Sequence, residues 1–147
     1  MITYKDIKKA VNTLLKSGFN IEINSNDVKE GFNRPSFFVS FDNLGRSSTV
    51  EQVEKSFTIR INYFPSDRND YSIELLDVQE QLENLFDLKL SVKDRHFNII
   101  EASSVTTDGV LEFSFDIEFS EGREAVYRTF GDNPDAELME TLDIRKG

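Results

Sequence analysis

Large apolar residues alternate with polar ones over residues 111–119, and this is the clearest pattern in the chain. Its odd positions are apolar and its even positions are polar or acidic, which is typical of a strand with one dry face and one wet face. Two other segments repeat the alternation. Their apolar members are Phe37, Val39 and Phe41 in one segment and Phe57, Ile59, Ile61 and Tyr63 in the other. We therefore predict a sheet with one face built largely of phenylalanine.

Two segments have helical periodicity instead. In the first, Thr3 can cap a helix together with Asp6, and Gly18 can end that helix. Its apolar stripe consists of Ile7, Ala10, Val11, Leu14 and Leu15. A second helix is predicted to follow the polar residues Asp67 to Asp70. One face of it carries Leu75, Val78, Leu82 and Leu85.

The remaining segments complete the expected order of elements. Strands are predicted at residues 20–24, 36–41, 53–64, 97–106 and 110–119. The dipeptide Asp108-Gly109 gives a tight turn into the last strand. Asn133 and Pro134 are typical of the N-cap and first residue of a helix, which predicts a short helix at residues 135–142.

This order indicates an α+β fold. Strands joined by loops and hairpins pair antiparallel, and two amphipathic helices of this length can cover one face of a sheet of about five strands. We therefore predict a two-layer, mainly antiparallel domain with a short C-terminal helix. At 147 residues the chain is expected to be one domain, residues 1–147, that buries enough surface to fold without staples.

Residues 42–52 follow neither periodicity, so we predict a long exposed loop there. Loops of this length on a rigid scaffold usually carry binding. The candidate interface residues in this segment are Asn43, Leu44, Arg46, Ser47 and Ser48. A second candidate segment, residues 125–130, follows the last strand. Its candidate interface residues are Tyr127, Arg128 and Phe130.

Composition narrows the function classes. The chain has no cysteine, which excludes disulfides and thiolate chemistry. Charged residues near the N-terminus argue against a signal peptide, and no apolar run reaches the length of a membrane span, so we expect a soluble intracellular protein. Twenty-seven acidic against seventeen basic residues give a net charge of −10. That charge opposes binding to nucleic acids and anionic membranes.

Candidate catalytic residues are few. His96 is the only histidine, so a zinc site would lack its usual second imidazole ligand. Asp116 and Glu118 share one strand face, but acidic alternation is also how an outward face stays soluble. No glycine-framed nucleophile elbow surrounds Ser47 or Ser48. We therefore predict no catalytic residue, no metal site and no cofactor; an enzyme would need a carboxylate pair in a concave pocket.

Four segments carry a resemblance to a known family. They are residues 28–32 (VKEGF), 34–39 (RPSFFV), 60–65 (RINYFP) and 107–113 (TDGVLEF). In this order and spacing, behind the N-terminal amphipathic helix, they resemble the bacteriophage tail terminator proteins. That family is found beside tail sheath and tube genes in phages and phage-derived particles of Gram-positive bacteria. The resemblance covers most of residues 1–119.

The resemblance implies a structural role. Such a protein forms a ring, commonly of six subunits, that caps the head-proximal end of the tail tube. It stops polymerisation of tube and sheath and presents a surface to the neck of the head. The implied partners are other copies of the chain, the tube, sheath and neck or connector proteins, with DNA only passing through the lumen and no membrane. The protein would be made in the bacterial cytoplasm and end in the virion tail.

One other binding class stays open from the sequence. A small acidic α+β protein can be an inhibitor or immunity partner that masks the basic active site of a nuclease or toxin. Such a protein would be a monomer that forms a one-to-one complex, so its mass in solution would distinguish it from a ring.

Overall fold

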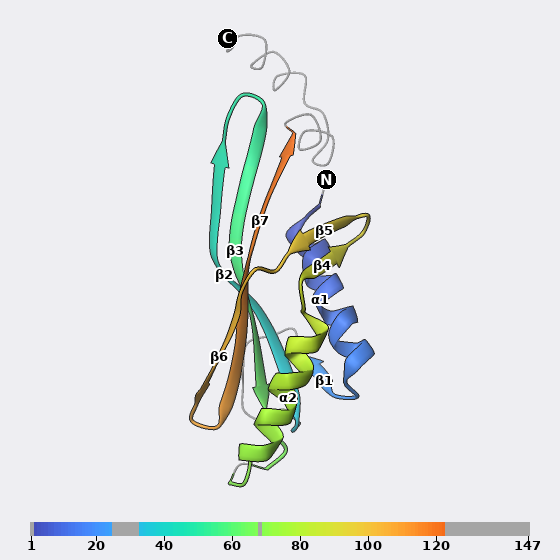
Figure 1. Cartoon of the computed structure of the whole chain (residues 1–147), viewed down its shortest axis with the longest axis vertical. Helices are drawn as coiled ribbons and strands as arrows, with labels where there is room; N and C mark the ends of the chain where they lie inside the picture. The colour runs from blue at the N-terminus through green and yellow to red at the C-terminus, as the bar shows by residue number, and fades with distance from the viewer. Residues whose placement is uncertain (1, 25–32, 68, 123–147) are drawn as a thin grey trace. The chain divides into compact units, whose positions relative to one another are not determined.

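The protein was described from a computed structural model, which places residues 2–24, 33–67 and 69–122 (Figure 1). The helices are α1 (Tyr4–Gly18) and α2 (Ser72–Leu85). The strands are β1 (Glu22–Asn24), β2 (Ser36–Ser48), β3 (Gln52–Phe64), β4 (Lys89–Val92), β5 (Arg95–Asn98), β6 (Ala102–Thr107) and β7 (Val110–Gly122). A five-stranded sheet has the order β1-β2-β3-β7-β6, and β4 pairs with β5 in a separate sheet. The fold class is therefore α+β, as predicted.

The chain divides into two compact units. Of the described residues, the larger unit holds those within Ile2–Asn43 and Phe57–Ile117, and the smaller unit holds Leu44–Ser56 and 118–122. Strands β2, β3 and β7 contribute residues to both units, so each unit is described by itself. The predicted helix at residues 135–142 lies outside the described residues.

The large sheet is mixed rather than formed only by antiparallel neighbours. β1 runs parallel to β2, with Glu22 opposite Ser36 and Asn24 opposite Phe38. Parallel neighbours need a longer connection than the tight turn of a hairpin. The predicted sheet was mainly antiparallel, and the parallel pair of β1 and β2 makes it mixed. β6 and β7 form the predicted antiparallel hairpin.

The predicted fourth strand, residues 97–106, is two strands in two different sheets. β5 ends at Asn98, and β6 begins at Ala102 on an edge of the large sheet. Between them the Ile99 amide donates to the Leu88 carbonyl at 2.7 Å. Ile99 and Ile100 are both apolar and continue the strand-like pattern. The sequence therefore does not show that one strand ends at Asn98 and another begins at Ala102. The partner of β5 is β4, a four-residue strand too short for its alternation to be noticed.

Helix α1 begins as the sequence predicts. The Thr3 hydroxyl accepts a hydrogen bond from the Asp6 amide at 3.1 Å, and the Asp6 carboxylate accepts one from the Thr3 amide at 3.0 Å. This reciprocal capping box satisfies two amides that the first helical turn leaves free. The helix ends at Gly18, where a Cβ atom would lie 2.7 Å from a methyl carbon of Leu85 in α2. Gly18 is therefore explained by close packing between the helices.

The predicted phenylalanine face is buried in the larger unit, and we name it the aromatic face. Its buried members include Phe37, Phe57, Phe113 and Phe115. Rings from the two helical regions contact it: the Tyr4 ring meets Phe57 edge-on at 5.4 Å, and Phe86 after α2 lies 5.2 Å from Phe115. Aromatic pairs at these separations add to the stabilisation from burial. The face is therefore structural core without reactive groups.

Candidate functional site

The other side of β3 and β7 in the larger unit is polar, and we name it the polar face. It carries Thr58, Arg60, Asn62, Glu112, Ser114 and Asp116. The Arg60 guanidinium forms ion pairs with Asp42 of β2 and Glu112 of β7. Hydrogen bonds to these two carboxylates raise the pKa of Arg60. Arg60 therefore links three neighbouring strands across a face that solvent reaches.

A second link runs across the same three strands. The Thr58 hydroxyl donates to a carboxylate oxygen of Asp116 at 2.6 Å. The same hydroxyl oxygen accepts a hydrogen bond from the Asn43 side-chain amide at 3.2 Å. The acidic side chains of the polar face are thus partly compensated by donors on β2 and β3. Their hydrogen bonds and ion pairs hold the side chains of this face in a defined arrangement.

These two links show that β2 contains a β-bulge. Asp42 and Asn43 are neighbours in the sequence, yet their partners Arg60 and Thr58 both belong to the polar face. In a regular strand successive side chains point to opposite faces. Asn43 has a φ of 56°, a left-handed conformation that asparagine tolerates better than most residues. An extra residue in this conformation is the signature of a bulge.

The predicted loop at residues 42–52 is therefore wrong, because β2 continues to Ser48 and β3 begins at Gln52. The connection is only residues 49–51, and the Thr49 amide closes it by donating to the Gln52 carbonyl at 2.8 Å. The sequence concealed this strand for two reasons. The bulge shifts the alternation by one residue, and the side chains beyond it are mostly exposed on both faces, so no apolar pattern is required.

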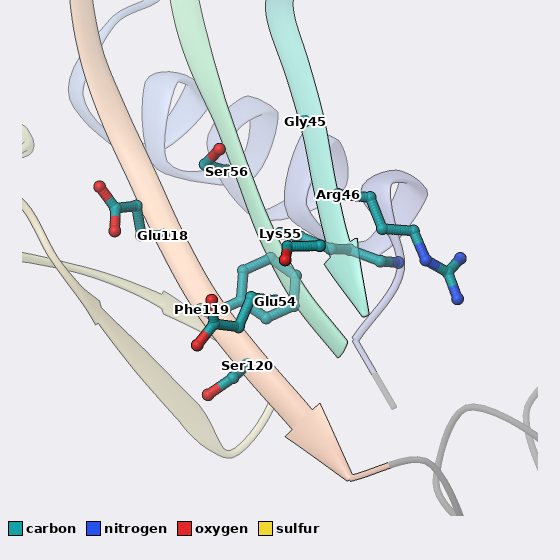
Figure 2. Close-up of a pocket in the computed structure, with 9 residues that line it drawn as sticks. Gly45, Arg46, Glu54, Lys55, Ser56, Glu118, Phe119 and Ser120 are labelled. Atoms are coloured by element: carbon teal, nitrogen blue, oxygen red, sulfur yellow. The ribbon is translucent and has the colours of Figure 1, made fainter. Parts of the chain in front are cut away.

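Beyond the bulge, the ends of β2 and β3 form a hairpin in the smaller unit, Leu44–Ser56. A Cβ atom on Gly45 would lie 3.1 Å from the Ser56 hydroxyl, so these two residues face the same way. Arg46 and Ser48 face the opposite way, since the Arg46 Nε donates to the Ser48 hydroxyl at 3.4 Å. Figure 2 shows Arg46 and Lys55 running toward one side of the strands, while Glu118 projects toward the other.

The smaller unit contains a hollow of about 510 Å³ (Figure 2). Its lining residues come from three strands: Gly45, Arg46, Ser47, Glu54, Lys55, Ser56, Glu118, Phe119 and Ser120. Polar side chains of both charges make such a surface suited to a protein partner rather than to an apolar small molecule. It contains neither histidine nor cysteine.

Lys55 is a buried cation beside this hollow. Burial lowers the pKa of Lys55, the nearby positive charge of Arg46 lowers it further, and Glu121 acts in the opposite direction. Glu121 is also buried. This pair of opposite charges interrupts the apolar alternation of β3 and β7 in the smaller unit.

Five of the candidate interface residues lie together on β2. Asn43 occupies the bulge, and Leu44, Arg46, Ser47 and Ser48 lie on the hairpin and are exposed. The structure brings Arg46 and Ser47 to the hollow. Candidate residues Tyr127, Arg128 and Phe130 lie outside the described residues.

The sequence did not indicate that Glu54, Ser56 and Ser120 line the same hollow as the candidate residues Arg46 and Ser47. Each is a polar even-numbered residue on β3 or β7, so the alternation in those strands was an available signal. The alternation shows which face of the sheet a residue occupies. It does not show which segment lies beside that residue, and the neighbouring end of β2 falls in the loop that the sequence predicts at residues 42–52.

The catalytic candidates are not brought together. His96 is exposed on β5, where its Nδ1 lies 2.7 Å from the Ser91 hydroxyl oxygen of β4. Asp116 belongs to the polar face of the larger unit, and Glu118 shares the hollow with Glu54 in the smaller unit. Within residues 2–24, 33–67 and 69–122, no three His, Asp or Glu side chains are grouped to hold a metal ion.

No helix that the structure places is long and apolar enough to cross a bilayer.

The ordered polar face and the exposed hairpin are surfaces that another protein could contact. Comparison with protein families identifies the class of protein. The model of the phage tail terminator protein family matches residues 6–127. This match covers most of the chain, so the chain belongs to the phage tail terminator protein family. A comparison with curated proteins finds no match.

Family membership confirms the resemblance drawn from the four sequence segments and extends it past residue 119. It assigns the chain a structural role in the phage tail and in virion assembly, with other tail proteins as its partners. The family is structural rather than enzymatic, which agrees with the scarcity of candidate catalytic residues.

Proposed function

We propose that this chain forms a ring of six subunits that caps the head-proximal end of the tail tube. The ring stops polymerisation of tube and sheath and provides the joining surface for the neck. The observation that carries this proposal is the family match over residues 6–127. In this proposal the chain acts as one tail-terminator domain, residues 1–147, with both helices on one side of the sheet.

We assign the contact with the tube or the adjacent subunit to the hairpin Leu44–Ser56. Leu44 is 56% exposed and Val50 is 75% exposed, although both are large apolar side chains. Exposed apolar side chains on a short polar hairpin are well suited to burial against a partner. The candidate residues Tyr127, Arg128 and Phe130 belong to a second proposed interface segment.

The charge of the chain supports a lumen that DNA passes through without binding. Each copy has a net charge of −10. Six copies concentrate negative charge around the opening, and an anionic wall repels the DNA backbone. We place the acidic polar face toward this lumen. The alternative of a one-to-one inhibitor of a basic enzyme gains no support from the family match.

Imaging of tails tests the proposal. Gold-labelled antibody against the chain is expected to bind only the head-proximal tail end, and particles lacking the chain should have overlong tails and unjoined heads. A matched control is labelling of the tube protein, which should extend along the tail. Label along the whole tube, or no label at the tail end, would refute the assignment.

A further inference from the structure

Helix α1 presents a stripe of lysines on its outer surface. Lys5, Lys8, Lys9 and Lys16 occur at spacings of three, four and seven residues, which places them on one side of a helix. They are exposed or half-buried. Among the described residues, no carboxylate pairs with any of them. In a chain with a net charge of −10, this is a concentration of uncompensated positive charge.

A hollow of about 490 Å³ lies beside this lysine stripe. It is lined by Lys5, Lys8 and Lys9 together with Asn12, Tyr4 of α1 and Phe41 of β2. The two aromatic rings are only half-buried. The surface of α1 therefore combines a small aromatic patch with positive charges around it.

Helix α2 presents the opposite combination. Asp77, Glu80 and Glu83 lie on one side of the helix and are exposed, and we name them the acidic stripe. On the same side, Ile73 is 74% exposed and Leu76 is 65% exposed. Within the described residues these three carboxylates form no ion pair. Two exposed apolar side chains therefore lie next to three uncompensated negative charges.

The exposed sides of the two helices are similar in length and opposite in charge. Lys5 to Lys16 spans about 16 Å along α1, and Ile73 to Glu83 spans about 15 Å along α2, at 1.5 Å per residue. The stripes of one chain do not neutralise each other, since none of their charges form an ion pair among the residues that the structure describes. On α2 the apolar Ile73 and Leu76 precede the three carboxylates, and on α1 Tyr4 precedes the four lysines. Apolar side chains next to polar and charged ones are common in protein interfaces.

We propose that the lysine stripe of α1 binds the acidic stripe of α2 on a second copy of this chain. Ile73 and Leu76 of one copy then cover Tyr4 and Phe41 of the next, and the lysines pair with the carboxylates around them. The contact joins two different surfaces, so each copy keeps one free stripe of each kind. Such a head-to-tail contact propagates and closes into a ring when the rotation permits. This inference rests on the proposed ring.

Cross-linking tests the contact directly, because the natural chain has no cysteine to interfere. Lys9→Cys and Glu80→Cys are made in separate chains, and both are supplied during tail assembly and also mixed as concentrated purified proteins. Under oxidising conditions the mixture is expected to give a covalent dimer of one copy of each. The control replaces Glu80→Cys by Glu101→Cys, an exposed acidic position between β5 and β6, and should give at least tenfold less dimer.

Charge reversal gives an independent measurement. Lys8→Glu with Lys9→Glu, and Asp77→Lys with Glu80→Lys, should each weaken self-association at least tenfold. The chain carrying all four changes should recover it, because the charges are again opposite. Circular dichroism checks that each variant keeps its helices, and raised salt should weaken the natural contact.

The outcomes separate this contact from the ring itself. If rings form at tail ends without the Lys9–Glu80 cross-link, the proposed contact is wrong and the ring proposal stands. The same conclusion follows if charge reversal does not weaken self-association of the chain. If the chain is absent from tail ends but the purified cross-link forms, the contact stands and the tail function falls. No cross-link in either preparation overturns the contact.

Discussion

Tyr63 on the buried side of β3 donates its phenolic hydrogen bond to Glu74 in the first turn of α2. Glu74 also accepts from the Ser66 amide at 2.9 Å and from the Ser66 hydroxyl at 2.8 Å. One carboxylate therefore fixes the start of α2 to the end of β3 and the segment after it. It also compensates the positive end of the helix dipole, which no side-chain cap does at Tyr71.

Glu74→Gln should destabilise the fold by about 1 to 3 kcal/mol, because the buried Tyr63 hydroxyl and the Ser66 amide lose a charged acceptor. The free energy of unfolding in urea measures this loss. Glu80→Gln, on the exposed side of the same helix, is the matched control and should change stability by less than about 0.5 kcal/mol. Equal effects of the two substitutions would show that Glu74 contributes nothing specific.

Stability should fall in acid through Asp6 and Glu74. The Thr3 amide and the Lys93 ammonium lower the pKa of Asp6 to about 2. Partial burial alone would raise the pKa of Glu74, but hydrogen bonds from Tyr63 and Ser66 outweigh it and lower that pKa. Both carboxylates therefore take up protons more readily in the unfolded chain, so their stabilisation is present above about pH 4.5 and falls at lower pH. The contribution of Asp6 is lost as pH falls toward about 2.

The melting temperature between pH 6 and pH 2 measures this loss. Asp6→Asn should melt lower than the natural chain at pH 6 and should show a weaker dependence on pH, because its capping group no longer titrates. Parallel curves for the two proteins would contradict the assignment of acid sensitivity to Asp6.

Asn43→Val should destabilise the bulge by about 1 to 2 kcal/mol, since a β-branched residue is strained at a φ of 56°. Asn43→Gly is the matched control: it relieves the strain but removes the hydrogen bond to Thr58. Urea unfolding should place the glycine variant nearer to the natural chain. A valine variant at least as stable as the glycine variant would argue against the left-handed conformation.

Phe115→Ala should cost about 3 to 5 kcal/mol, because it opens a cavity where Phe115 packs against Phe86 and Phe113. Tails made with this variant should overgrow or fail to join heads for want of folded protein. His96→Ala, Asp116→Asn and Glu118→Gln should leave assembly intact. An indispensable His96 in a folded protein would instead indicate a chemical role for this side chain.

Leu44→Ser with Val50→Ser tests the proposed hairpin contact. Both side chains are exposed, so stability should change by less than about 0.5 kcal/mol, whereas tail length control and head joining should be impaired. Deleting residues 43–48 would be a poor test, because β2 pairs with β3 there. Unchanged tails from the double variant would refute the hairpin assignment.

The elements that the sequence predicted well are those whose signal is local. The Thr3 and Asp6 capping box lies within one helical turn. The Asp108-Gly109 turn has φ values of 52° and 77°, the left-handed pair that this dipeptide favours, and it joins the paired residues Thr107 and Val110. In both cases the residues that determine the structure are adjacent to the residues that adopt it.

The elements that the sequence missed depend on distant partners. The parallel pairing of β1 depends on β2, and the strand beyond Asn43 is held by β3 rather than by burial of its own side chains. The lysine stripe was visible in the sequence as single charges. Its meaning required the structure, which shows that no described carboxylate of the same chain compensates it.

The bulge at Asn43 also changes what insertions and deletions would do. β2 already holds one residue more than regular pairing with β3 requires. Removing Asn43 would leave each residue of the hairpin facing as it does now, with Gly45 still beside Ser56. Adding a residue next to Asn43 would reverse them all, turning Arg46 away from Lys55. The hairpin should therefore tolerate a shorter chain at this position better than a longer one.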